Sequence, residues 1–288
     1  MDYQKFKVNG ENKVSISDFQ TNSGDAKEFK EKIIEETAKN LVEISLLQEK
    51  LYSDSKEGLI IVLQAMDAAG KDSTIKHVMK GINPQGVMVT SFKKPTSNEL
   101  EHDFLWRANR ALPKRGYIAI FNRSYYEDVL VVKVRKLYEN YSMPKRCIGD
   151  DIIKKRYKHI KNYEDYLYDE GFRVVKIFLN VSKDEQKERF LERIDLKIKN
   201  WKFSEADVRE RQLWDKYQEA YEDLINATST KCNPWYVVPA NAKWYTRFIV
   251  SEILLETLKD INPQFPTLPE EKLKNLANER ELLMNEQN

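Results

Sequence analysis

Residues 59–74 read Leu59-Ile60-Ile61-Val62-Leu63-Gln64-Ala65-Met66-Asp67-Ala68-Ala69-Gly70-Lys71-Asp72-Ser73-Thr74. A short apolar run, typical of a buried strand, passes through small residues to Gly-Lys and then to a polar helix start. This is the layout of a phosphate-binding loop, in which backbone N–H groups and the positive end of a helix converge on an anion. Lys71 is then expected to reach the more distal phosphates. The alternative is an ordinary strand–turn–helix junction that carries a surface lysine.

The loop departs at two positions from the usual pattern G-x-x-x-x-G-K-[ST]. Ala65 takes the place of the first glycine, which requires that the backbone keeps a negative φ there. Asp72 takes the place of the Ser or Thr that ligates Mg²⁺. We therefore expect Asp67 to supply the metal ligand, because hard cations such as Mg²⁺ or Mn²⁺ prefer carboxylate oxygen.

The composition limits the partners of the chain. Of its 288 residues 33% are charged, but the formal net charge is only +2, so a surface that binds anions has to come from local clusters of basic residues. The two cysteines, Cys147 and Cys232, form neither a disulfide framework nor a metal cluster, which is typical of a reducing cytoplasm. We find no signal peptide, no apolar run of membrane-spanning length and no recognisable nucleic-acid-binding module. These observations predict a cytoplasmic protein without membrane or nucleic-acid partners.

Short apolar strands alternate with helices along the chain. The expected strands are 59–63, 87–92, 117–121, 174–179 and 235–238. Strands separated in this way indicate an α/β fold with a parallel five-stranded sheet flanked by helices, and the loops that follow the strands share one edge of that sheet. We expect an irregular arm at 1–25, one phosphate-binding domain at 26–262 and a polar tail at 263–288. The amphipathic helix expected at 26–51 is a candidate surface for packing against another copy of the chain.

The third strand is followed by Phe121-Asn122-Arg123-Ser124-Tyr125-Tyr126-Glu127-Asp128. Phosphoryl transfer needs positioning, a metal ion and cations on the non-bridging oxygens. Asn122 stands where an acidic metal ligand is usual, and its amide can orient a water or a phosphate. Arg123 is placed to bridge phosphates through a bidentate contact, the alternative being a surface arginine at a strand end. The predicted catalytic residues are Asp67, Lys71, Asn122 and Arg123, with Asp67 as the metal ligand.

Other residues are candidates for holding the substrates. Two basic pairs, one on the helix after the loop and one on the helix after the fourth strand, are spaced four apart and so share a helix face, although solvated surface is the alternative for each. A basic stretch after the third strand is expected to fold over a polyanion as a lid at about 129–170. The predicted phosphate-binding set is Ala68, Ala69, Gly70, Asp72, Ser73, Thr74, Lys76, Lys80, Lys133, Arg135, Arg189 and Arg193. The predicted nucleotide-binding set is Lys93, Trp106, Arg107, Glu127 and Asp128.

Several motifs of the chain resemble those of the family-2 polyphosphate kinases. They are the runs 65–72 (Ala-Met-Asp-Ala-Ala-Gly-Lys-Asp), 102–107 (His-Asp-Phe-Leu-Trp-Arg), 111–116 (Ala-Leu-Pro-Lys-Arg-Gly) and 121–130 (Phe-Asn-Arg-Ser-Tyr-Tyr-Glu-Asp-Val-Leu). The resemblance continues through 200–204, 211–215, 226–230 and 234–239, in the same order, and so spans roughly residues 30–260.

The resemblance implies a P-loop kinase fold related to thymidylate kinase, with a helical lid. It also implies a reversible, Mg²⁺-dependent transfer of phosphoryl groups between inorganic polyphosphate and nucleotides. Asn122 and the run Phe-Asn-Arg-Ser-Tyr-Tyr look most like the class III subgroup, which accepts both nucleoside mono- and diphosphates. The expected partners are therefore inorganic polyphosphate, AMP and ADP, in a homo-oligomer (dimer or tetramer). Two alternatives stay open: an ATP-dependent nucleoside or nucleotide kinase, and a polyanion-binding module without turnover.

Overall fold

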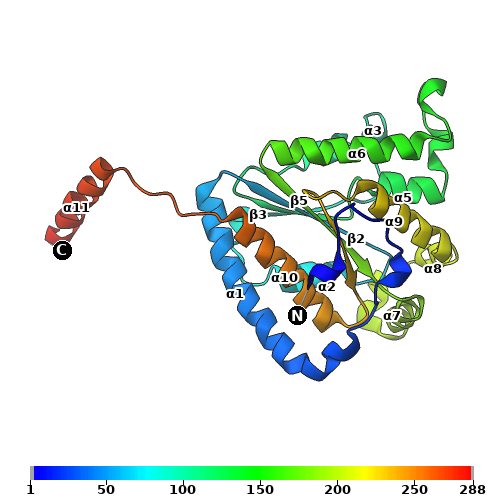
Figure 1. Ribbon diagram of the computed structural model, residues 1–288, viewed down its shortest axis with the longest axis horizontal. Helices are drawn as coiled ribbons and strands as arrows, with labels where there is room; N and C mark the ends of the chain where they lie inside the picture. Colours follow the sequence, from blue (N-terminus) through cyan, green and yellow to red (C-terminus); the bar gives the residue numbers. More distant parts are fainter. Residues whose placement is uncertain (1–2, 287–288) are drawn as a thin grey trace.

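A central sheet organises the computed structural model, which describes residues 3–286 (Figure 1). The sheet formed by these residues has six strands in the order β1-β6-β5-β2-β4-β3. Five of them are parallel: β2 (Gly58–Ala65), β3 (Val87–Ser91), β4 (Ile118–Asn122), β5 (Phe172–Asn180) and β6 (Trp235–Pro239). The prediction of an α/β fold with five parallel strands is confirmed.

The sixth strand was not predicted. Strand β1 (Lys7–Val8) lies in the segment expected to be irregular and pairs antiparallel with β6, with Val8 opposite Trp235. Phe6, Val8 and Ile16 are buried, so this N-terminal segment contributes to the core. A strand of two residues leaves no alternating pattern, and sequence periodicity therefore could not reveal it.

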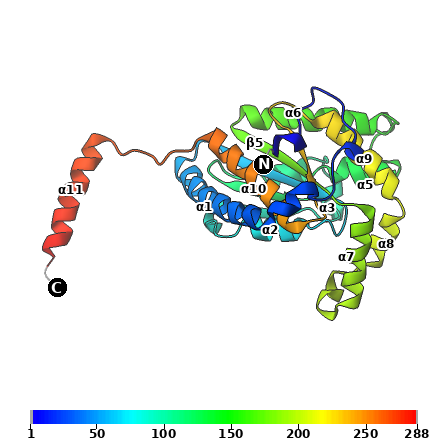
Figure 2. The same ribbon diagram turned by 60° about the horizontal axis from the view of Figure 1, so that its bottom comes forward.

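Helices cover both faces of the sheet (Figures 1 and 2). Helices α1, α2 and α10 pack together on one face, and α5, α6 and α9 pack together on the other. The pair α7 and α8 projects from the body of the molecule in Figure 2. The helices are α1 (Lys30–Asp54), α2 (Lys71–Val78), α3 (Ser97–Leu100), α4 (Trp106–Arg110), α5 (Glu127–Val134), α6 (Ile152–Asp169), α7 (Lys183–Asp195), α8 (Glu205–Arg211), α9 (Trp214–Thr228), α10 (Lys243–Ile261) and α11 (Glu270–Asn285).

Two parts of the chain each form two helices with a break between them. The segment 99–112 forms the short helices α3 and α4, and the Asp103 carboxylate accepts the Leu105 N–H (2.9 Å) just before α4 begins. The segment 204–226 forms α8 and α9, which meet at Leu213. The β-branched run 129–134 lies in α5, which packs against α9 and α6 on the covered face of the sheet.

Helix α11 lies away from the rest of the structure on an extended connection (Figures 1 and 2). Three prolines, Pro263, Pro266 and Pro269, occur in this connection and prevent it from continuing helix α10. The polar tail predicted from 263 onward therefore contains a helix. Within residues 3–286, none of the helices combines the length and apolar character needed to cross a bilayer.

Candidate active site

A cleft of about 340 Å³ opens at the carboxyl ends of β2 and β4. In an open parallel sheet this edge is where ligands bind, because the loops after neighbouring strands converge there. Most residues of the lining are polar, and many of them are cationic. The lining residues are Asp67, Ala68, Gly70, Lys71, Asp72, Ser73, Ser91, Phe92, Lys93, Asn122, Arg123, Arg189, Glu192, Arg193, Lys199, Lys202 and Lys243.

The loop after β2 has the geometry of a phosphate-binding loop. Ala68 and Gly70 adopt positive φ values of 61° and 111°, and helix α2 begins at Lys71 directly after them. Ala65 is still the last residue of β2 and does not adopt a positive φ, which explains how alanine replaces the usual glycine. The N-terminus of α2 therefore faces the cleft, where its positive end favours an anion.

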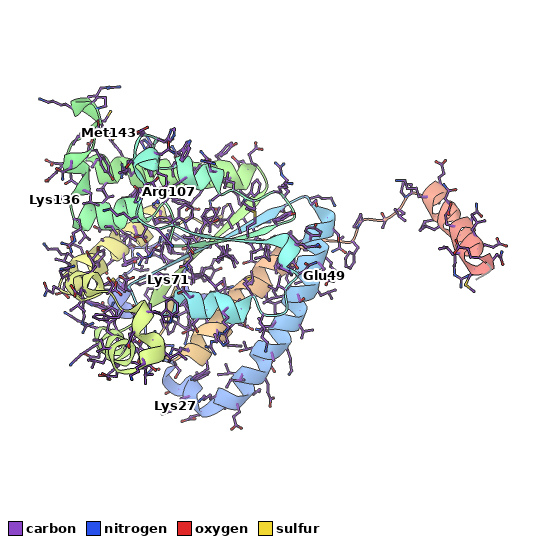
Figure 3. All side chains as sticks on the ribbon, turned by 180° about the vertical axis from the view of Figure 1, so that it is seen from behind. Lys27, Glu49, Lys71, Arg107, Lys136 and Met143 are labelled. Carbon is purple, nitrogen blue, oxygen red and sulfur yellow. The ribbon has the colours of Figure 1, made fainter. Side chains whose placement is uncertain are left out.

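Lys71 lies at the floor of the cleft, near the middle of the molecule in Figure 3. Its Nζ donates to the carbonyl oxygens of Ala65 (3.0 Å) and Met66 (3.4 Å). The pKa of the Lys71 ammonium is lowered to about 8, mainly by burial and also by the neighbouring Arg123 charge, against the opposite effect of Asp67. A bound phosphate would offset both effects, because its negative charge stabilises the ammonium form.

Arg123 connects the loop after β4 to the phosphate-binding loop. Its guanidinium donates to the Asp67 carboxylate and to Glu127 Oε2 (3.3 Å). The charges of Glu127 and Asp67 raise the pKa of Arg123 against the effect of burial, so the group stays cationic. Next to it, Asn122 Nδ2 donates to Asp72 Oδ1 (2.8 Å). Two polar contacts therefore join the loops after β2 and β4.

The family model for polyphosphate kinase 2 matches residues 27–266. The chain belongs to the polyphosphate kinase 2 family. It is 44% identical over 283 residues to the "ADP-polyphosphate phosphotransferase" of Rhodopseudomonas palustris, covering 98% of each chain. It is 50% identical over 220 residues to the "AMP/ADP-polyphosphate phosphotransferase" of Meiothermus ruber, covering 76% of this chain and 79% of that one. The crystal structure of polyphosphate kinase 2 from Arthrobacter aurescens superimposes with a TM-score of 0.83 at 35% identity, over 98% of this chain and 96% of the other.

A polyphosphate kinase 2 needs a divalent metal, and the oxygen donors at the cleft fit one. Asp67 and Asp72 present carboxylates, and Asn122 presents an amide, which are hard oxygen ligands. Residues 3–286 contain no group of three or more His, Cys, Asp or Glu side chains that could hold a metal by themselves. Substrate phosphates would therefore have to complete the coordination, as is usual for Mg²⁺.

Arg189 braces the phosphate-binding loop. Its side chain is almost completely buried and donates to the carbonyl oxygens of Ala68 (3.0 Å) and Ala69 (2.7 Å). It also donates to the carbonyl oxygens of Ala240 (2.7 Å) and Asn241 (3.0 Å), and to the Glu185 carboxylate (2.8 Å). The sequence predicted that Arg189 binds phosphate. Arg189 does line the cleft, but its donors are already engaged by these protein acceptors.

Four of the predicted phosphate-binding residues lie elsewhere. Lys76 on α2 and Lys80 on the turn after it are exposed and are not part of the cleft lining. Lys133 pairs with Asp223 on α9, and Arg135 pairs with Glu210 on α8 (2.7 Å). Their role in phosphate binding stays a prediction: four-residue spacing identified a shared helix face for Lys76 and Lys80, but only the packing of the helices decides whether that face meets the cleft.

Of the predicted nucleotide-binding residues, Lys93 is the one that lines the cleft. Arg107 donates to the carbonyl oxygen of Lys93 (2.8 Å), which lines the cleft, and lies near Asp128 (3.8 Å). Burial raises the pKa of the Asp128 carboxyl to about 6, although Arg156 and Arg107 act in the opposite direction. Trp106 stacks on His102, with 4.0 Å between the ring centroids, and does not line the cleft.

Sequence analysis missed three cationic residues of the cleft. Lys199 and Lys202 belong to a 3₁₀ segment (Lys197–Lys202) after α7, and Lys243 begins α10. The basic run from 197 to 202 was the available signal, but no pattern indicates that it turns back over the loop after β2.

The lid was expected over 129–170. Among residues 3–286, the cleft lining includes no member of that segment. In Figure 3, Lys136 and Met143 lie at the outer side of the molecule, away from Lys71. The segment that approaches the phosphate-binding loop is 197–211, in which Asp207 pairs with Arg193 (3.1 Å). Burial and the Asp67 charge raise the pKa of the Asp207 carboxyl, against the opposite effect of Arg193.

Proposed function

We propose that the protein transfers the terminal phosphoryl group of inorganic polyphosphate to AMP and ADP. The observation that carries this proposal is the number of cations in the cleft. Lys71 and Arg123 are enough to hold the phosphates of a nucleotide, but Arg193, Lys199, Lys202 and Lys243 line the same cleft. A row of cations beyond the nucleotide site favours a donor that is a long polyanion.

In the proposed reaction, an oxygen of the nucleotide's terminal phosphate attacks the terminal phosphorus of polyphosphate. A new P–O bond forms while the bond to the next phosphate of the chain breaks, and the shortened polyphosphate leaves with the bonding electrons. The nucleophile is already ionised at neutral pH, so the site requires no strong general base. Lys71 and Arg123 neutralise the charge that collects on the transferred group.

The metal in this proposal is Mg²⁺, for which Mn²⁺ can substitute. Asp67 is the residue that would hold it, with Asp72 as a second carboxylate and Asn122 beside them. When bound, Mg²⁺ neutralises phosphate charge and aligns the phosphates. The proposed roles of these side chains rest on their position at the strand ends.

The two substrates would enter from opposite sides of Lys71. Lys93, Arg107 and Asp128 would lie toward the nucleotide, and Arg193, Lys199, Lys202 and Lys243 toward the polyphosphate. The segment 197–211 would serve as the lid in place of 129–170, because it carries cations into the cleft and is held to α7 by the Arg193–Asp207 pair.

One reaction tests the donor and the acceptors together. The pure protein is mixed with AMP or ADP, long-chain polyphosphate and Mg²⁺ in the absence of ATP, and the nucleotides are separated by chromatography. We expect ADP and ATP from AMP, and ATP from ADP. ATP from ADP alone would reject AMP as an acceptor, in line with the name of the Rhodopseudomonas relative. No product from either acceptor, together with transfer from added ATP, would favour an ordinary nucleotide kinase.

We also propose that the protein works in the cytoplasm as a homo-oligomer. Support for a second copy comes from α1, whose Ile34, Val42 and Leu46 are exposed apolar side chains. Light scattering of the pure protein measures its mass in solution directly, and a mass of 34.1 kDa would reject the oligomer.

A further inference from the structure

We propose that a buried polar cluster behind the cleft positions Arg123 and Glu127 for phosphoryl transfer. The cluster consists of Tyr125, Tyr126, Glu164, Lys176 and Thr228, and its side chains come from the loop after β4 and from α6, β5 and α9. Its members do not line the cleft, so we assign them as positioning residues. The inference rests on the proposed function in one respect, because the effect of the cluster on kcat is measured in the polyphosphate-dependent reaction.

A fully buried ion pair forms the centre of the cluster. Lys176 on β5 and Glu164 on α6 are 0% and 1% exposed, and the Lys176 Nζ lies 2.5 Å from Glu164 Oε2. Lys176 also donates to the Thr228 carbonyl oxygen (2.7 Å). Removing two charges from water is costly, and a buried ion pair is often no more stabilising than apolar side chains of similar size. The stability of the sheet therefore does not by itself account for a lysine in the middle of β5.

The second oxygen of the Glu164 carboxylate contacts the loop after β4. Its Oε1 accepts hydrogen bonds from the hydroxyls of Tyr125 (2.7 Å) and Tyr126 (2.8 Å), and both tyrosines are at most 1% exposed. The Tyr126 hydroxyl also lies 3.1 Å from Thr228 Oγ1, which in turn accepts from Trp235 Nε1 (2.9 Å). Two consecutive residues of the loop are thereby fixed to α6, β5 and α9.

These two tyrosines lie between Arg123, which lines the cleft, and Glu127, which accepts from it. Arg123 precedes them with φ = 61°, a left-handed conformation that non-glycine residues adopt at a cost and that the surrounding structure has to maintain. Glu127 follows them as the first residue of α5 and accepts from Arg123. The cluster therefore holds the backbone on the C-terminal side of the strained residue.

A second set of contacts holds the other side of the loop. The Arg123 N–H donates to the Leu63 carbonyl oxygen of β2 (3.0 Å). The buried Gln64 amide, in the orientation that pairs both of its ends, donates to Glu127 Oε1 (2.9 Å) and accepts from the Ser124 N–H (3.0 Å). Arg123 is thus held between β2 and the buried cluster. Because catalysis by Arg123 depends on where its guanidinium lies, a shift of about 1 Å in this loop is expected to cost on the order of a hundredfold in rate.

Two variants separate positioning from stability. Tyr125→Phe/Tyr126→Phe removes both hydroxyls and leaves the ion pair, whereas Lys176→Met/Glu164→Met removes the ion pair and leaves both hydroxyls. The second variant exchanges a buried ion pair for apolar groups of similar volume, but it also leaves the Tyr125 and Tyr126 hydroxyls without their Glu164 acceptor. We therefore expect it to be less stable than the parent protein, and its kcat is measured at a temperature where circular dichroism shows it to be folded. Tyr157→Phe is the matched control, because its buried hydroxyl has no hydrogen-bond partner among the described residues.

We expect both double variants to be folded and to show a kcat about ten- to a hundredfold lower, with KM values for ADP and polyphosphate changed by less than about threefold. Amide hydrogen exchange of residues 123–127 should become faster in both, and Tyr157→Phe should match the parent protein in both measurements. Wild-type kcat and exchange in folded double variants would overturn the proposal. Faster exchange in a protein whose parent makes no nucleotide product would instead show that the cluster holds the loop and that the proposed function is wrong.

Discussion

The Arg123 guanidinium donates to the Asp67 carboxylate, and this contact joins the loops that follow β4 and β2. The two side chains are 35% and 27% exposed, so both remain accessible from the cleft. From one position, the Arg123 guanidinium would therefore contact both the Asp67 carboxylate, which would bind the metal, and the phosphates that the metal would hold. In the proposed reaction, substrate phosphates would compete with Asp67 for this guanidinium.

Replacing this guanidinium should reduce catalysis while preserving the fold. We expect Arg123→Lys to lower kcat by about a hundred- to a thousandfold, because an ammonium cannot make the bidentate contact with phosphate. The measurement is ATP formation from ADP and polyphosphate at saturating substrate. Arg115→Lys is the control, since Arg115 is half-exposed and pairs with Glu170 (3.4 Å) outside the cleft. More than a third of the parent kcat in Arg123→Lys would contradict this role.

Lys71 is expected to be as important as Arg123. Lys71→Ala removes the cation at the floor of the cleft, and we expect turnover to fall by about three orders of magnitude with an unchanged circular dichroism spectrum. Lys80→Ala tests specificity, because Lys80 is on the turn after α2, exposed and outside the cleft lining. Near-parent activity of a folded Lys71→Ala protein would contradict a catalytic role for Lys71.

The lowered pKa of Lys71 predicts how activity depends on pH. In the free protein the pKa of Lys71 is about 8, so the ammonium is charged below that pH and loses its proton above it. We expect kcat/KM for polyphosphate to be constant from pH 7 to about 8 and then to fall roughly tenfold per unit. In the substrate complex the phosphates raise the pKa of Lys71, so kcat should stay constant to a higher pH. Lys71→Arg should lack the decline, because arginine stays protonated throughout; an identical decline in that variant would assign the titration to another group.

Arg189 is expected to affect stability before it affects catalysis. Its guanidinium is buried against four backbone carbonyls, and Arg189→Met would leave these acceptors unpaired. Breaking a buried charged contact costs about 3–5 kcal/mol, which corresponds to a fall in Tm of roughly 6–12 °C for a protein of this size. Lys187→Ala, an exposed change on the same helix, serves as the control in calorimetry. A Tm within about 2 °C of the parent protein would show that the phosphate-binding loop does not depend on this side chain.

The sequence predicted the sheet and the phosphate-binding loop because both leave local signals. Strand β2 is buried over all eight residues, which appears in the sequence as a continuous apolar run. The polar residues after β2 and β4 could be placed together because parallel strands end at one edge. Asp67, Lys71, Asn122 and Arg123 are indeed brought to one cleft.

The same reasoning could not show which basic residues line the cleft and which are paired with acidic residues elsewhere. Arg189 and Arg193 are one helical turn apart and both line the cleft, yet Arg189 is buried against the carbonyls of the loop whereas Arg193 has its partner on α8. Lys176 lies in an apolar strand without any local sign that its partner is Glu164, twelve residues earlier on α6. Which charged side chains form pairs depends on how the helices pack over the sheet. A local pattern in a single sequence does not contain that information.

The basic residues therefore distinguish best between a polyphosphate site on the segment 129–170 and one in the cleft. Lys199, Lys202 and Lys243 line the cleft, whereas Lys133 and Arg135 are paired with acidic residues of α9 and α8. We expect Lys199→Ala/Lys202→Ala/Lys243→Ala to weaken polyphosphate binding and to reduce the slope of log K against log salt by about 0.7 for each phosphate contact that is lost. Lys133→Ala/Arg135→Ala should leave that slope unchanged, because these cations release no counterions when the cleft fills. Titration of long-chain polyphosphate at several salt concentrations measures both slopes, and an equal reduction in the two variants would return the polyphosphate site to the segment 129–170.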